Sequence, residues 1–296
     1  MEALMALNSK VNSFVWGPPM LVLLVGTGVY LTLKQSWPQI SKFGYAMKNT
    51  VGKLAEKGEG AGGEVTPFQA LATAMAATVG VGNIAGVATA IATGGPGAVF
   101  WMWLSAFFGM CTKYSEAVLA VHYRDVLPDG TIIGGPFKYI EKGLNAKWLA
   151  SIFALFGALA AFGIGNMTQS NSIAQVLDTY FGVPTLVSGI VVAILVGVVV
   201  IGGLKNIVKV TEKLVPFMCI FYIIGGLILI VMNLGQVPAA IGLIVSQAFT
   251  GSAAVGGFAG STVMLAMNKG VARGVFSNEA GLGSAPIVHA TAKVQH

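Results

Sequence analysis

The stretch Ala77-Thr78-Val79-Gly80-Val81-Gly82-Asn83 lies inside a 48-residue run, Val65 to Thr112, that contains no Asp, Glu, Lys or Arg. One membrane-spanning helix needs about 20 residues, so the run is long enough for two. The glycines and polar side chains predict a break in the first of these helices. Hydrocarbon offers backbone groups no hydrogen-bond partners, so a helix is interrupted there only where the freed groups face protein, ions or ligand. The break is therefore a candidate binding site.

The composition predicts a polytopic membrane protein. Hydrophobic residues make up 55% of the chain and charged residues 9%, against about 25% charged in an ordinary soluble domain. Mean hydropathy is +0.78. We expect about seven hydrophobic segments of membrane-spanning length, of which the last is broken. The first segment has no signal-peptide cleavage pattern and is expected to be a retained helix. The charge-free runs are Val11–Leu33, Val65–Thr112, Trp148–Leu177, Thr179–Leu204 and Leu214–Asn268.

Basic residues gather on one side of the expected membrane. Most of the 17 Lys and Arg residues follow the first, third and fifth spans, as in Lys34 to Lys57, Arg124 to Lys147 and Lys205 to Lys213. That side is predicted to be cytoplasmic, which places the N-terminus outside the cell. A net charge of +6 distributed in this way does not indicate nucleic-acid binding.

Cysteine and histidine give no sign of metal or redox chemistry. Cys111 and Cys219 each lie in an apolar run and are interpreted as small packing residues. His122, His289 and His296 have no ligand partner three or four residues away, so no metal site is predicted.

The break at Thr78–Asn83 has two other interpretations. Gly80, Gly82 and Gly86 resemble phosphate-loop glycines, but that pattern needs a preceding strand and a βαβ unit. Gly82 and Gly86 also form a small-xxx-small pair that favours close helix packing. Packing explains the glycines but not Thr78 and Asn83. An unwound turn, by contrast, presents carbonyl groups to a cation, and the next half-helix presents N–H groups to an anion.

A second Gly-punctuated polar island runs from Arg273 to Pro286 and includes Phe276, Ser277 and Asn278. It is compatible with an interfacial loop at the end of a helix. A second break in the corresponding part of a second repeat, however, is typical of a transporter site.

Several of these stretches, in order, carry a family resemblance. The chain resembles the alanine or glycine:cation symporter family, which is related in fold to the bacterial leucine transporter and the amino acid–polyamine–organocation transporters. The resemblance runs from about residue 15 to the end of the sequence. The matching stretches are Thr66–Leu71, Val79–Val87, Gly109–Ala117, Gly134–Ile140 and Phe276–Pro286.

The resemblance implies an all-α, leucine-transporter-like inverted-repeat fold with one extra N-terminal helix. Family members are considerably longer, so this sequence is expected to stop after the first core helix of the second repeat. The segments implied are an extra helix over 11–33, a cytoplasmic amphipathic segment over 34–65, a first five-helix repeat over 66–232, an external re-entrant or surface segment over 233–257, and a broken helix over 258–296.

The resemblance also implies the site. Gln169 is chosen as a substrate contact because the resemblance makes its helix the third core helix; interhelical hydrogen bonding is the alternative for this amide. Phe276 is expected to form an apolar wall over a small side chain, and packing is an equal alternative for a lone aromatic. Backbone carbonyls near Ala76 and Val79 and the side chain of Asn83 are expected to bind sodium, since oxygen suits a hard cation. The expected substrate-binding residues are Thr78, Val79, Gly80, Gly82, Gln169, Phe276, Ser277 and Asn278.

The function implied is sodium-coupled symport of alanine or glycine into the cell by alternating access. The partners expected are the small amino acid, Na⁺ as coupling ion and the lipid bilayer. A membrane-embedded enzyme is disfavoured because His-x-x-x-His, His-x-x-Glu-His and Gly-x-Ser-x-Gly do not occur in a span. A passive channel would show no requirement for sodium, so sodium dependence separates it from a symporter.

Overall fold

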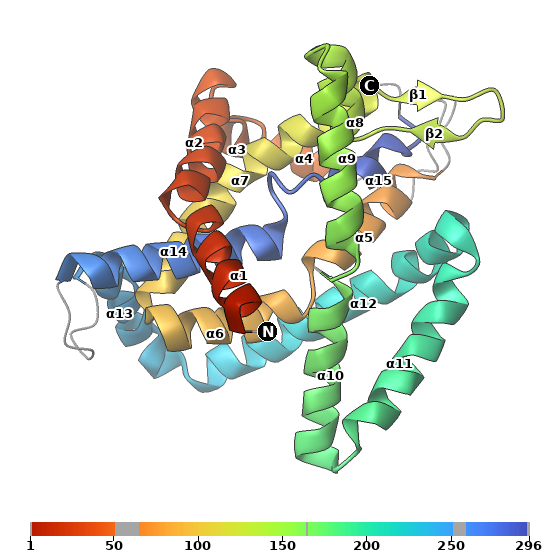
Figure 1. Ribbon diagram of the computed structural model, residues 1–296. Coiled ribbons are helices and arrows are strands. Elements are labelled where there is room, and N and C mark those ends of the chain that lie inside the picture. The colour runs from red at the N-terminus through yellow and green to blue at the C-terminus, as the bar shows by residue number, and fades with distance from the viewer. Residues whose placement is uncertain (1, 51–64, 164, 251–258, 295–296) are drawn as a thin grey trace. The chain divides into compact units, whose positions relative to one another are not determined.

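The computed structural model describes residues 2–50, 65–163, 165–250 and 259–294, and the chain there is predominantly helical (Figure 1). The expected all-α character is confirmed apart from one two-stranded hairpin. The helices from the N-terminus are α1 (Glu2–Val15), α2 (Pro18–Lys34), α3 (Pro38–Ser41), α4 (Phe43–Thr50), α5 (Pro67–Thr78), η2 (Val81–Asn83), α6 (Ala85–Gly94), α7 (Gly97–His122) and α8 (Pro136–Gly143). The strands are β1 (Asp125–Val126) and β2 (Ile132–Ile133). The remaining helices are α9 (Lys147–Ala161), α10 (Asn166–Phe181), α11 (Thr185–Val200), α12 (Gly203–Met232), η3 (Leu234–Gln236), α13 (Val237–Thr250), α14 (Ala259–Asn278) and α15 (Ser284–Ala290).

The chain forms two compact units. Unit 1 comprises Met1–Gly52, Gly82–Ser115 and Gly225–Leu282, and unit 2 comprises Lys53–Val81, Glu116–Ile224 and Gly283–His296. The chain passes from one unit to the other within both Gly-rich stretches, between Val81 and Gly82 and between Leu282 and Gly283. Each break in the sequence thus contributes residues to both units.

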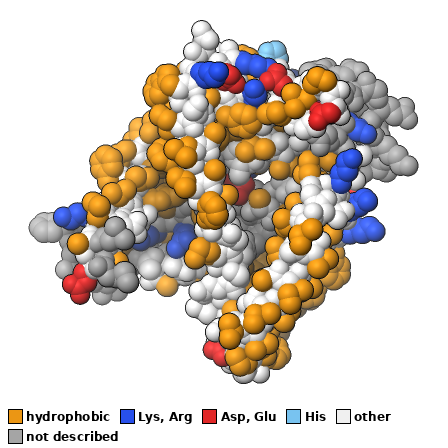
Figure 2. Space-filling view, turned by 45° about the vertical axis from the view of Figure 1, so that its right-hand side comes forward, with side chains coloured by type: hydrophobic (Ala, Val, Ile, Leu, Met, Phe, Trp, Pro, Cys, Tyr) orange, Lys and Arg blue, Asp and Glu red, His pale blue; other side chains and the backbone are white. Residues whose placement is uncertain are grey.

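Three helical stretches of the described chain are long and apolar enough to cross a membrane, or four if the broken pair α5 and η2–α6 counts as one. They are Met5–Lys34, Lys147–Phe181 and Gly203–Met232. Three of the seven expected segments are not among them: α11 has only 16 residues, α7 carries Lys113 and Glu116, and α14 carries Lys269 and Arg273. Figure 2 shows hydrophobic side chains exposed along the helices in view, as lipid-facing surfaces require.

The broken helix begins with a strong start signal. Thr66 and Gln69 form a capping box in which each side chain accepts a hydrogen bond from the other residue's backbone N–H, at 3.2 and 3.0 Å. Pro67 occupies the first turn, where its missing N–H costs nothing. These groups fix the start of α5 twelve residues before the break.

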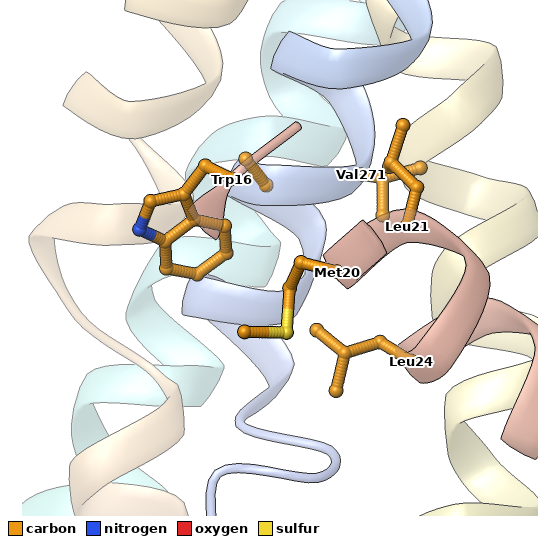
Figure 3. A pocket seen from close by; sticks show the side chains of 6 residues that line it. Trp16, Met20, Leu21, Leu24 and Val271 are labelled. Atoms are coloured by element: carbon orange, nitrogen blue, oxygen red, sulfur yellow. The ribbon is translucent and has the colours of Figure 1, made fainter. Parts of the chain in front are cut away.

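In unit 1, small residues bring α7 and α14 together. A Cβ added to Gly270 would lie 2.3 Å from the carbonyl oxygen of Ala98, and one added to Gly274 would lie 3.2 Å from Ser105 Oγ. The first span also contacts α14: Trp16, Met20 and Leu24 line a narrow apolar cleft with Val271 that leaves no space for water (Figure 3). Close backbone approach of this kind is the usual basis of helix packing in membranes.

In unit 2, β1 and β2 form an antiparallel hairpin that is bound to α8. Lys138 Nζ lies 2.8 Å from Asp125 Oδ2, and Lys142 also pairs with Asp125. These two lysines, Lys138 first, hold the pKa of Asp125 below its ordinary value. The charged stretch between α7 and α9 therefore contains a hairpin and a helix, joined by ion pairs.

Two boundaries differ from the sequence expectation. The continuous apolar run Trp148–Leu177 is divided into α9 and α10, because Gly163 and Gly165 fall between them. Lys205, Lys209 and Lys213, which follow the fifth expected span in the sequence, lie in the first turns of α12. Their spacing of four residues places them on one helix face. The inverted repeat and its segment boundaries stay predictions, and 51–64 and 251–258 lie outside the described residues.

Candidate functional site

In unit 2 the first break is held by Gln169 of α10. The N–H of Val81 donates to Gln169 Oε1 at 3.1 Å. Gly80 lies so close that a Cβ there would be 2.8 Å from Gln169 Nε2. α5 has ended at Thr78, so the amide replaces the intrahelical partner that the Val81 N–H lacks. The sequence predicted Gln169 as a substrate contact; the structure places its side chain against this break, and its role toward a substrate stays a prediction.

Thr78 and Val79 form the end of α5 in the same unit. The Thr78 hydroxyl donates back to the carbonyl oxygens of Met75 and Ala74, at 3.2 and 3.4 Å. Val79 is extended, with φ −102° and ψ 105°, and its N–H donates to Met75 O. Ala76, Thr78 and Val79 are all half-buried. The last carbonyl groups of a helix have no intrahelical partner, and the sodium role of the Ala76 and Val79 carbonyls stays a prediction.

In unit 1, the remainder of the break contacts the end of α14. A Cβ built on Gly82 would be in ordinary van der Waals contact with the Phe276 ring, at 3.5 Å. The Ser277 hydroxyl donates to Asn83 Oδ1. Two sequence motifs that are almost two hundred residues apart are thus in contact. The oxygen assigned to sodium has a second oxygen, Ser277 Oγ, beside it.

Asn278 ends α14 and lines two cavities of unit 1. One has a volume of about 180 Å³ and also includes Trp103, Gly274 and Ser277; the other, about 10 Å³, includes Ser105 and Thr112. Asn278 Oδ1 accepts a hydrogen bond from the Ala280 N–H at 2.9 Å, which orients the amide. Its Nδ2 is buried and has no hydrogen-bond partner among the described residues. An unpaired buried donor of this kind favours a ligand or water.

The second break differs in backbone geometry. Glu279, Gly281 and Gly283 have φ values of 54°, 85° and 80°. Lys113 Nζ donates to the Asn278 carbonyl at 3.3 Å, which satisfies one of the groups freed at the end of α14. Glycine is favoured at two of these positions because residues with a side chain rarely adopt such a conformation, although Glu279 does so here.

The sequence did not predict the contacts in unit 2 that fix the start of α5 and the residues at the end of α15. Gln69 Nε2 donates to Glu212 Oε2 at 2.7 Å. The Arg124 guanidinium donates to three carbonyl oxygens, those of Ala290, Ala292 and Val294, each at 2.8 Å. Val65 and Ala292 form a parallel bridge. Pairs of residues so far apart have no local sequence pattern. A charged residue at the end of an apolar helix, such as Arg124, does however indicate that a partner is needed.

The sodium:alanine symporter family model matches residues 1–296. The chain belongs to this family. It is 54% identical over 295 residues to the sodium/alanine symporter AgcS of Methanococcus maripaludis, covering 98% of this chain and 64% of AgcS. The family is one of transporters rather than enzymes, and the protein is a multi-pass membrane protein, in keeping with its apolar helices.

Other members of the family carry different descriptions. A putative sodium/proton-dependent alanine carrier protein, YrbD of Bacillus subtilis, is 42% identical over 97% of this chain and 57% of its own length. The probable sodium/glutamine symporter GlnT of the same organism is 38% identical over 96% of this chain and 58% of its own. The chain thus spans about three-fifths of the length of the curated relatives it matches. Family membership by itself leaves the amino acid and the ion open.

Proposed function

We propose that the protein carries out sodium-coupled symport of small neutral amino acids, alanine or glycine, into the cell by alternating access. The observation that carries the proposal is the hydrogen bond from the Val81 N–H to Gln169 in a helix broken at Gly80 and Gly82. A side-chain amide and freed backbone groups in an apolar segment are what a zwitterion needs for binding without a fixed protein charge.

The proposed substrate contacts are those expected from the sequence. Thr78, Val79, Gly80 and Gln169 contribute from unit 2, and Gly82, Phe276, Ser277 and Asn278 from unit 1. The buried, unpaired Nδ2 of Asn278 supports a role as donor to a substrate oxygen.

The proposed sodium ligands are the carbonyl groups of Ala76 and Val79 and the side chain of Asn83. The Ser277 hydroxyl adds support, because it lies against Asn83 Oδ1 and could turn its own oxygen toward a cation. Two neighbouring neutral oxygens suit a hard monovalent ion, as oxygen ligands suit other hard cations. The N-terminus is proposed to be external and the basic segments cytoplasmic.

Counterflow of labelled alanine in liposomes tests the proposal. The intact protein should accumulate label against unlabelled internal alanine when Na⁺ is present, and not when choline replaces it. Equal uptake in both media would contradict symport and favour a passive channel. Chemical conversion of the label would favour an enzyme.

A further inference from the structure

The chain leaves the first apolar span by a fixed turn. Ser36 and Trp37 both adopt the left-handed conformation, with φ values of 58° and 55°. The Trp37 N–H donates to Thr32 O at 2.9 Å. Gln35 Nε2 donates to Ser115 Oγ at 2.8 Å and Gln39 Nε2 to Thr32 Oγ1 at 2.7 Å, all within unit 1. The left-handed backbone of Ser36 and Trp37, together with these three hydrogen bonds, sets the direction in which the chain continues from the span into α3 and α4.

The surface of α3 and α4 is apolar to an unusual degree. Trp37, Ile40, Phe43 and Tyr45 are 42%, 66%, 63% and 70% exposed. Along α4, Phe43, Ala46 and Met47 recur at helical spacing and share one face, whereas Lys48 and Asn49 lie on the other. This is an amphipathic helix whose apolar face has no partner among the described residues.

The charge of the same segment is entirely positive. Lys34, Lys42 and Lys48 are exposed, and the sequence from Ala3 to Ala55 contains no Asp or Glu. Lys34 Nζ lies 5.9 Å from the centre of the Tyr30 ring at the end of the span. A basic, aromatic-rich segment that follows a span and contains an amphipathic helix has the chemistry of the membrane–water interface, where phosphate groups meet acyl chains.

We propose that the segment Trp37–Thr50 lies in the membrane interface and binds anionic phospholipid head groups through Lys34, Lys42 and Lys48. The apolar face of α4 would enter the acyl boundary and the lysines would contact the phosphates. Charge complementarity favours an anionic lipid over a zwitterionic one. The proposal is independent of the transported substrate, because it rests only on the end of the first span and on α3 and α4.

Native mass spectrometry of the intact protein in detergent tests the proposal, with phosphatidylglycerol and phosphatidylcholine titrated separately. Each lysine near an anionic surface contributes a several-fold gain in affinity, so K34Q/K42Q/K48Q should lose at least tenfold in phosphatidylglycerol affinity and leave phosphatidylcholine unchanged. F43S/M47S should weaken both lipids. Free glycerol 3-phosphate should not compete, since it lacks acyl chains.

The matched control is K205Q/K209Q/K213Q, which removes the same charge from the first turns of α12. It should lose clearly less phosphatidylglycerol affinity than the first triple variant, with both proteins melting at the parental temperature. Parental affinity in K34Q/K42Q/K48Q, or an equal loss in the control, would overturn the proposal. Competition by glycerol 3-phosphate would also overturn it, because a soluble phosphate site would then be present.

Discussion

The two helix breaks use glycine in different ways. At the first, Gly80 and Gly82 have ordinary negative φ values, and what they provide is space against Gln169 and Phe276. At the second, Gly281 and Gly283 adopt left-handed φ values and also lie against other side chains: a Cβ on Gly281 would be 2.7 Å from Leu24, and one on Gly283 2.7 Å from Phe153.

Because of this difference, substitutions at the two breaks are expected to affect different properties of the protein. A larger residue at Gly80 meets the far end of a flexible glutamine, which can move. A larger residue at Gly283 meets a ring and a proline, and it also strains the backbone. We therefore expect substitution of a glycine at the first break to alter ligand affinity and substitution of a glycine at the second break to alter stability.

The largest effect is expected for Gly283→Ala. The left-handed conformation costs about 1–2 kcal/mol for a residue with a Cβ, and forcing a methyl group into a filled site costs a further 1–3 kcal/mol or so. Gly182→Ala is the matched control, because Gly182 has φ +65° but nothing within 4 Å of its added Cβ. Thermal melting should show Gly283→Ala clearly less stable than Gly182→Ala. Equal losses would mean that backbone strain alone matters.

Gly80→Ala should weaken alanine binding at nearly parental stability. The new Cβ meets the end of the Gln169 side chain and displaces the amide that we propose as a substrate contact. Loss of one hydrogen bond between this amide and the ligand costs about 1–3 kcal/mol, or roughly tenfold to a hundredfold in affinity. Gly157→Ala on α9, with nothing within 4 Å, should bind as the parent does. A destabilised Gly80→Ala with parental affinity would reverse the assignment of the two breaks.

Asn83→Ala should raise the half-saturating sodium concentration several-fold while leaving substrate choice unchanged. The reason is loss of one oxygen next to Ser277. Asn233→Ala serves as control, since that amide donates to Leu229 of the preceding helix. Sodium titrations of alanine uptake that coincide for Asn83→Ala and the parent would remove Asn83 from the ion site.

Phe276→Ala should give the smallest effect, which is acceptance of substrates with larger side chains. The parent is expected to accept alanine and reject leucine, because the Phe276 ring lies against Gly82 and would clash with a larger substrate side chain. Competition by leucine should appear in Phe276→Ala and stay absent in Phe249→Ala, whose ring packs on Phe100 and Trp101 instead. Strong leucine competition in the parent would contradict the steric explanation.

The start of α5 and the positions of the two breaks could be predicted from local sequence chemistry. Thr66, Pro67 and Gln69 form a start signal that acts within four residues, and the glycines of both breaks are visible as interruptions of apolar runs. Contacts between distant residues were not predictable in the same way. Arg124 binds carbonyl groups some 170 residues away, and backbone carbonyls carry no sequence signature. Gln169 was found only because the resemblance placed its helix.

The most direct test of the proposed site is the alanine dissociation constant of Gln169→Leu, measured with and without sodium alongside its melting temperature. We predict sodium-dependent binding in the parent, and in the variant a loss of roughly tenfold to a hundredfold or more at parental melting temperature, since one amide hydrogen bond to the ligand is removed. If Gln169 only joins helices through Val81, the melting temperature should fall and the affinity stay nearly unchanged. A stable variant with parental affinity would contradict both roles of Gln169.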